Sequence, residues 1–203
     1  MSNNVDTKIR EQVDRLGVPC NEMLRKEIAR YERKAGYNKL FRLALVSIVA
    51  VAAIIIVVTN LWLAVLQIDG TSMSPQLSMD EVVVAIRDNN PQRSDIIAFS
   101  HDNKVYIKRV IALAGSWVDI NDEGIVSVNG ARLDEPYVAK PDMGTCDLTF
   151  PHQVPAGTVF VMGDNRASSM DSRDSRIGEV SREQIIGKVK LSVWPLSRFG
   201  MVS

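Results

Sequence analysis

The chain has 203 residues and a formal net charge of zero, with 24 Lys+Arg against 24 Asp+Glu, and it has two cysteines. This composition argues against a strongly basic nucleic-acid binder, an acidic disordered tail and a cysteine-rich scaffold. The charges are divided unevenly along the chain, however. Residues 1–42 hold 10 Lys+Arg and 6 Asp+Glu, residues 43–68 hold no charge, and residues 69–203 hold 14 Lys+Arg and 18 Asp+Glu.

Residues 1–42 predict a basic helical arm. Asn21 is suited to cap a helix, the sequence EMLRKEIARYERKA that follows is rich in helix formers, and Gly36 is suited to end the helix. Basic side chains on such a helix favour contact with anionic lipid headgroups. A solvated helix that packs on a partner fits the same pattern, so both interpretations stay open.

The uncharged stretch predicts a transmembrane helix over residues 43–66. Such a helix would be about 36 Å long, enough to cross a hydrocarbon core of about 30 Å with some tilt. A cleaved signal peptide is disfavoured, because its apolar stretch is shorter and lies close to the N-terminus, whereas some 42 residues come first here. Trp62 fits an anchor at the membrane interface.

The charges that flank this span predict its orientation. Four Lys or Arg residues lie between positions 33 and 42, whereas the first charge after the span is Asp69 and the first cation is Arg87. By the positive-inside rule, the N-terminus lies in the cytoplasm and residues 67–203 lie outside the cell membrane. Cys20 and Cys146 would then lie on opposite sides of the membrane, so no disulfide framework is expected.

Residues 67–203 predict one mainly β, antiparallel domain. Apolar stretches, alternating or continuous, predict strands at 81–86, 95–100, 104–113, 117–121, 124–128, 158–162 and 186–193. Asn129-Gly130 predicts a tight hairpin turn. One short helical turn is expected over 181–185, with Ser181 as its cap, and no long amphipathic helix is expected after the span.

Three short blocks in this domain contain residues suited to nucleophilic catalysis. Ser72 follows Gly70-Thr71, where the backbone can expose its hydroxyl, although most serines near glycines are turn residues. Lys108 lies in the apolar strand predicted at 104–113. If buried, this lysine would have a lowered pKa and could act as a general base, whereas on an edge strand it would reach water. Residues 163–173 are dense in charges and hydroxyls, which by itself fits a solvated loop.

Taken together, these blocks resemble those of the bacterial type I signal peptidases, the membrane-anchored Ser–Lys endopeptidases of the S26 type. Five stretches carry the resemblance, in matching order: Ser72-Met73-Ser74-Pro75, Arg93–Phe99, Tyr106–Ile111, Gly163–Arg173 and Trp194-Pro195-Leu196. The match covers about residues 41–200, and the arm before it has no recognised counterpart. Departures occur at Gln76, at 112–116 and at Ala167-Ser168, and none removes a catalytic group.

The resemblance implies that Ser72 is the nucleophile, Lys108 is the general base, and Ser169 orients Lys108. The Ser72 N–H is the implied oxyanion donor, because Gly70 offers no hydroxyl, as in the Gram-positive form of the family. We interpret four further charged residues as ion-paired scaffolding around the dyad: Asp164, Asp171, Arg109 and Arg173. Shallow apolar subsites that accept small residues such as Ala are implied for five residues: Ile68, Met73, Leu77, Tyr106 and Ile107.

The implied domains are a cytoplasmic arm (1–42), a transmembrane helix (43–66) and an extracytoplasmic β serine-peptidase domain (67–203). The implied function is removal of N-terminal signal peptides from exported preproteins, without a metal or cofactor. Its implied partners are the preproteins, the lipid bilayer and the secretion translocon, and not nucleic acid. Two alternatives stay open: a specialised relative that processes pilins or conjugation proteins, and an inactive membrane-tethered module that only binds exported chains. A self-cleaving repressor with a Ser–Lys dyad is disfavoured by the span.

Overall fold

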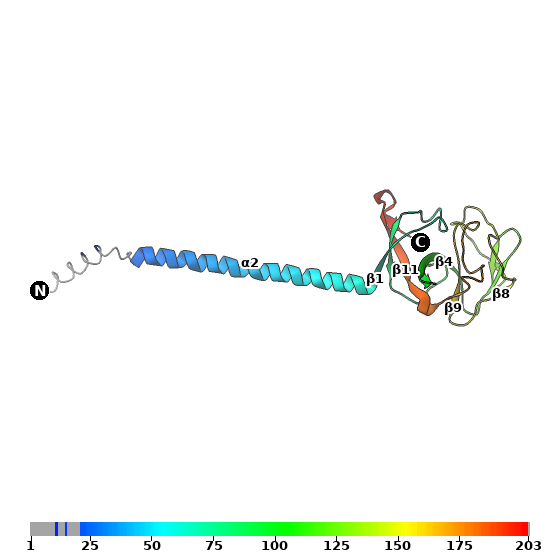
Figure 1. Ribbon diagram of the computed structural model, residues 1–203, viewed down its shortest axis with the longest axis horizontal. Coiled ribbons are helices and arrows are strands. Elements are labelled where there is room, and N and C mark those ends of the chain that lie inside the picture. The colour runs from blue at the N-terminus through cyan, green and yellow to red at the C-terminus, as the bar shows by residue number, and fades with distance from the viewer. Residues whose placement is uncertain (1–10, 12–14, 16–20, 203) are drawn as a thin grey trace. The chain divides into compact units, whose positions relative to one another are not determined.

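The computed structural model describes the backbone of residues 11, 15 and 21–202 (Figure 1). The chain divides into two compact units, residues 1–57 and 58–203. Much of the predicted arm lies outside the described residues. The predicted three-part division into domains therefore stays a prediction.

One continuous helix, α2 (Asn21–Trp62), replaces the two helices expected in the N-terminal part of the chain. The predicted helix stop at Gly36 is wrong, since the roughly 1 kcal/mol that a glycine costs inside a helix does not interrupt a long run of good helix formers. Within α2, residues Leu40–Thr59 are long and apolar enough to cross a membrane. This stretch fits a membrane anchor.

The predicted end of the span differs from the structure. The helix ends at Trp62, and the last four residues expected in it belong to strand β1 (Leu63–Gln67). All five residues of β1 pair in antiparallel register with β2 (Val82–Ile86). Strand pairing therefore determines the backbone conformation of residues 63–67. Hydropathy alone does not predict the boundary between α2 and β1.

The second unit contains two antiparallel sheets, which confirms the predicted mainly β class. The strands of the larger sheet run in this order: β1, β2, β11 (Ile185–Trp194), β3 (Ile96–His101), β4 (Lys104–Leu113), β9 (Thr158–Met162) and β10 (Val180–Ser181), with β12 (Gly200–Met201) paired to β11. The strands of the smaller sheet follow the order β7 (Ala131–Arg132), β6 (Val126–Val128), β5 (Trp117–Ile120) and β8 (His152–Gln153).

Local signals in the sequence agree with these elements. Asn129 and Gly130 have φ angles of 53° and 78°, which fit a tight hairpin turn between β6 and β7. Ser181 precedes a single 3-10 turn, Arg182–Gln184, and its N–H donates to the Gln184 side chain at 2.8 Å. The four two-residue strands were not predicted, because so short a segment shows no alternation.

Strand β4 is the element that matters most for the site. It pairs with β3 on one side and, from Arg109 onward, with β9 on the other. Its residues 107–112 are buried without alternation. Ile107 packs in one apolar cluster, Val110 in a second and Ile111 in a third. A side chain in this stretch is therefore removed from water on either face of the strand.

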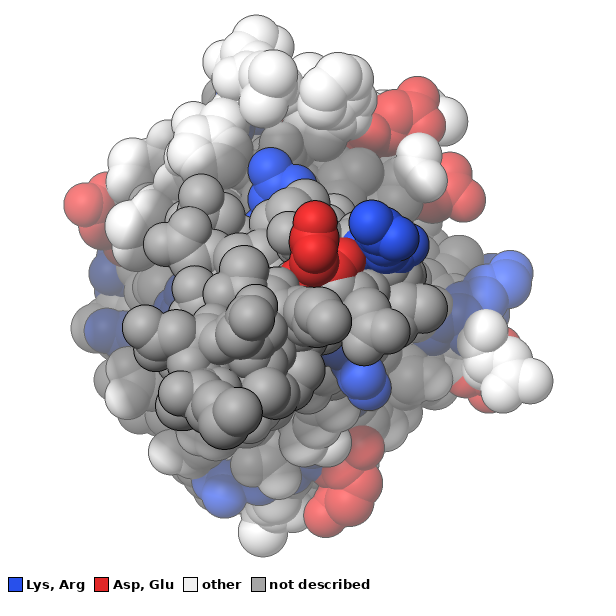
Figure 2. Space-filling model, turned by 90° about the vertical axis from the view of Figure 1, so that its left-hand side faces the viewer, with Lys and Arg blue, Asp and Glu red and all other residues white. Residues whose placement is uncertain are grey.

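The described surface has charges of both signs. Among the residues coloured in Figure 2, acidic and basic side chains are interspersed. Several large apolar side chains near the C-terminus are nevertheless exposed: Trp194, Leu196, Phe199 and Met201.

Candidate active site

Ser72 and Lys108 meet in the second unit. Lys108 Nζ donates a hydrogen bond to Ser72 Oγ at 2.7 Å. Ser72 lies on a turn that follows β1, and Met73 and Leu77, each 1% exposed, anchor this turn in the core. The Leu77 N–H also donates to the Met73 carbonyl at 2.9 Å. The nucleophile is thus held by a turn that packing makes rigid.

Lys108 is only 3% exposed, so the alternative of an edge-strand lysine in water does not hold. Burial lowers the pKa of its amine from 10.5 to about 8. The carboxylates of Asp171 and Asp164 oppose this shift, whereas Arg173 adds to it. A pKa near 8 leaves a usable fraction of neutral amine at neutral pH, as a general base requires.

The loop that follows β9 contacts the backbone of Thr71 and Ser72. The Asn165 N–H donates to the Ser72 carbonyl at 3.0 Å, and the Asn165 side-chain amide donates to the Thr71 carbonyl at 3.3 Å. Gly163 lies so close that a Cβ there would stand 2.5 Å from the Ser72 carbonyl oxygen and would also overlap the Ser169 side chain. Only glycine therefore lets this loop approach the nucleophile.

Ser169 is buried beside this contact, at 3% exposure, and its hydroxyl oxygen has no hydrogen-bond partner among the described residues. The expected hydrogen bond to Lys108 is thus not formed in this structure. A buried hydroxyl without a hydrogen-bond partner costs free energy. The role of Ser169 in orienting Lys108 stays a prediction.

Two buried ion pairs flank the dyad. Arg109 binds Asp164 through two hydrogen bonds, Nε to Oδ1 at 2.9 Å and Nη2 to Oδ2 at 2.8 Å. Arg173 binds Asp171 in the same way, at 2.8 and 2.9 Å, and Asp171 also accepts the Gly163 N–H at 2.9 Å. The ion pairing predicted for these four residues is confirmed, and their service to catalysis stays a prediction.

Sequence reasoning missed a third buried ion pair. Arg166, whose side chain is fully buried, binds Glu135 through Nη1 to Oε2 at 3.0 Å and Nη2 to Oε1 at 2.5 Å. Arg166 lies in the block at 163–173, but Glu135 lies 31 positions earlier in a loop without periodicity. No local pattern marks such a partner.

An open cleft of about 720 Å³ lies against the dyad. Four of the five predicted subsite residues line it: Ile68, Met73, Tyr106 and Ile107. Leu77 does not line this cleft, because its side chain is buried in the apolar core, and its role in a subsite stays a prediction. Four lining residues were not predicted: Leu66, Val105, Ser168 and Met170.

The residues that the structure describes include no group of three or more His, Cys, Asp or Glu side chains that could hold a metal ion.

Comparison with known proteins defines the class of this enzyme. A family model described as signal peptidase, peptidase S26, matches residues 40–194. The chain belongs to this family, and it is a serine endopeptidase of the signal peptidase I type with an apolar helix that fits a membrane anchor.

Individual relatives agree with that class. Signal peptidase I of Bacillus caldolyticus is 38% identical over 150 residues, which are 65% of this chain and 80% of that protein. Signal peptidase I S of Bacillus subtilis strain 168 is 32% identical over 163 residues, 74% of this chain and 88% of that protein. The crystal structure of a signal peptidase I from Enterococcus faecalis V583 is 33% identical and covers 49% of this chain and 96% of its own, with a TM-score of 0.42.

Proposed function

We propose that the protein removes N-terminal signal peptides from exported preproteins, with Ser72 as the nucleophile and Lys108 as the general base. The observation that carries this proposal is the 2.7 Å hydrogen bond from Lys108 Nζ to Ser72 Oγ at the side of an open cleft. A buried lysine with its pKa lowered to about 8 is suited to take the serine proton.

The reaction proceeds in two halves. Neutral Lys108 accepts the proton of Ser72 while Oγ attacks the scissile carbonyl carbon, and a tetrahedral intermediate forms. The intermediate collapses when the C–N bond breaks, and the Lys108 ammonium gives its proton to the leaving amine. Water, deprotonated by Lys108, then attacks the ester on Ser72 and releases the new carboxyl end.

The negative charge of the intermediate needs a fixed donor. In the part of the chain that the structure describes, the N–H of Ser72 donates to no backbone carbonyl. Gly70, two positions earlier, has no side chain to contribute, and its φ of 112° favours glycine. The backbone N–H of Ser72 is therefore the donor that we assign to the oxyanion.

Two free strand edges border the cleft. In the described part of the chain, β1 pairs only with β2, and residues 104–108 of β4 pair only with β3. Residues from both segments line the cleft, so an extended substrate peptide could pair with either edge. We propose that the subsites beside Ser72 accept small side chains such as Ala before the cut, as the resemblance implies.

We further propose that the enzyme lies in the cell membrane with its N-terminus in the cytoplasm and residues 67–203 outside. The apolar segment Leu40–Thr59 and the cations before it support this orientation. The exposed apolar residues Trp194, Leu196 and Phe199 fit contact with the lipid bilayer. The secretion translocon, which delivers preproteins to this side, is the further partner proposed.

The test uses full-length protein in detergent and a preprotein with an Ala-x-Ala site before the cut. We expect cleavage after that site by the unchanged chain and none by Ser72→Ala or Lys108→Ala. Cleavage by either variant at the rate of the unchanged chain would contradict the mechanism. Folding of unchanged protein without any cleavage of preproteins would favour the inactive binding module, and cleavage confined to pilin-like substrates would favour the specialised relative.

A further inference from the structure

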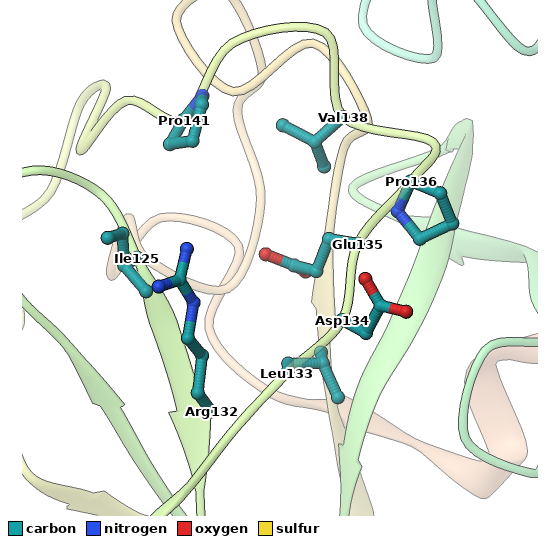
Figure 3. Close-up of a pocket in the computed structure, with 8 residues that line it drawn as sticks. All are labelled: Ile125, Arg132, Leu133, Asp134, Glu135, Pro136, Val138 and Pro141. Atoms are coloured by element: carbon teal, nitrogen blue, oxygen red, sulfur yellow. The ribbon is translucent and has the colours of Figure 1, made fainter.

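A segment that follows the last residue of β7 in the smaller sheet contacts the loop at 163–173. None of its residues takes part in the proposed reaction. Residues 133–138 follow β7, and all of them except Tyr137 line a cavity of about 410 Å³, shown in Figure 3. The carboxylates of Asp134 and Glu135 point in different directions there (Figure 3). Asp134 is exposed, whereas Glu135 is partly buried and carries the contacts that matter.

Glu135 is the carboxylate partner of Arg166. The guanidinium of Arg166 is removed from water, and both of its Nη atoms bind the Glu135 carboxylate. A buried guanidinium without its carboxylate is strongly unfavourable. The position of Arg166, and of the loop that carries it, therefore depends on a residue of the segment that follows β7.

Arg166 is linked to the nucleophile Ser72 through Gly163. Arg166 Nε donates to the Gly163 carbonyl at 3.1 Å. Gly163 in turn lies against the Ser72 carbonyl oxygen and the Ser169 side chain, where even a Cβ has no room. A shift of Gly163 thus moves the backbone on which the Ser72 hydroxyl and N–H are fixed.

Tyr137 connects the same segment to the strand that carries the base. Its hydroxyl donates to Glu135 Oε1 at 3.1 Å, and its ring lies 4.0 Å from the guanidinium carbon of Arg109, next to Lys108 in β4. Burial and the Glu135 charge raise the pKa of Tyr137, so its hydroxyl stays protonated and keeps donating. One segment therefore contacts two arginines: Arg166, in the loop that lies against Ser72, and Arg109, next to Lys108 in β4.

We propose that Glu135 and Tyr137 are positioning residues for the Ser72–Lys108 dyad, acting through Arg166 and Arg109. The inference rests on the proposed function, since it concerns the geometry of that dyad. It gives the segment after β7 a role in catalysis, although no residue of this segment is among the residues that line the cleft.

The test measures kcat and KM for preprotein cleavage by full-length variants in detergent. Glu135→Gln keeps the shape of the side chain and removes its charge, and we expect kcat to fall roughly ten-fold or more, as for a small misplacement of reacting groups. KM should stay within about two-fold, because the cleft itself is unchanged. Glu135→Asp, which keeps the carboxylate, should recover part of the kcat.

Asp134→Asn is the matched control, because it removes one charge from the neighbouring, exposed residue. We expect it to leave kcat and KM unchanged. Equal kcat for Glu135→Gln and Asp134→Asn would overturn the proposal, and so would a loss that Glu135→Asp does not relieve. If Glu135→Gln does not fold, Tyr137→Phe decides: lower kcat at unchanged KM supports the proposal, and unchanged kcat overturns it.

Ser72→Ala separates this inference from the proposed function. If Ser72→Ala still cleaves, the proposed role of Ser72 as nucleophile fails, whatever Glu135→Gln does. If Ser72→Ala is inactive and Glu135→Gln behaves like Asp134→Asn, only the inference fails.

Discussion

Lys108 has two requirements that conflict in water: it must be a strong enough base, and it must be uncharged. Burial in β4 favours the neutral amine, while the nearby carboxylates of Asp171 and Asp164 limit how far the pKa falls. The resulting pKa of about 8 lies between these effects. The residue type and the apolar strand were visible in the sequence, but the degree of burial depends on β9 and on the loop after it, which lie more than fifty residues away.

The pH dependence of kcat/KM follows from this pKa. Because the base must be neutral, kcat/KM should rise about ten-fold per pH unit on the acid side and level off above a pH of about 8. The measurement is initial-rate cleavage of a preprotein peptide in detergent between pH 6 and pH 10, with buffers of constant ionic strength. A limb that continues to rise up to about pH 10 would show a lysine with the pKa of a solvated amine.

At the scale of elements, the site is a meeting of one strand and two loops. β4 was predicted with its observed bounds, because a long apolar run with a clear start and end is readable in the sequence. The end of α2 and the start of β1 were not predicted correctly. The sequence LWLAVLQ suits a helix and a strand equally well, and pairing with β2 determines which of the two forms. The contact of Glu135 with Arg166 could not be predicted either, since it joins two loops without periodicity.

The approach of the 163–173 loop to Ser72 gives a prediction at this scale. Gly163→Ala should abolish most of the cleavage activity, because its Cβ would meet the Ser72 carbonyl oxygen at 2.5 Å and displace the loop or the nucleophile. Gly200→Ala is the control, since a Cβ there meets nothing within 4 Å. Cleavage rates and thermal unfolding are compared for both variants, and full activity of Gly163→Ala would contradict the close approach.

At the scale of the whole molecule, the zero net charge conceals a basic arm, an uncharged helical stretch and a mildly acidic body. The structure confirms a long apolar stretch inside α2 and an antiparallel β unit. This organisation could be predicted from the sequence, because hydropathy and charge differ between stretches that are tens of residues long. The charges that flank the span are the only basis for predicting which side of a membrane each part occupies.

The two cysteines provide a measurement of that orientation. Cys146 is partly exposed in the β unit, and Cys20 precedes α2. In intact protoplasts, we expect a membrane-impermeant maleimide to label the Cys20→Ser variant through Cys146. The Cys146→Ser variant, which keeps Cys20, should be labelled only after the membrane is permeabilised. The reverse pattern would place the β unit in the cytoplasm.

The absence of a side chain at Gly70 has a consequence for inhibitors. With Gly70 two positions before the nucleophile, the oxyanion donor that we assign is a main-chain amide, which every amino acid except proline possesses. An inhibitor that derives its affinity from that amide and from Ser72 would leave few point mutations through which resistance could arise. One that derives its affinity from Val105 or Met170 in the cleft would offer many.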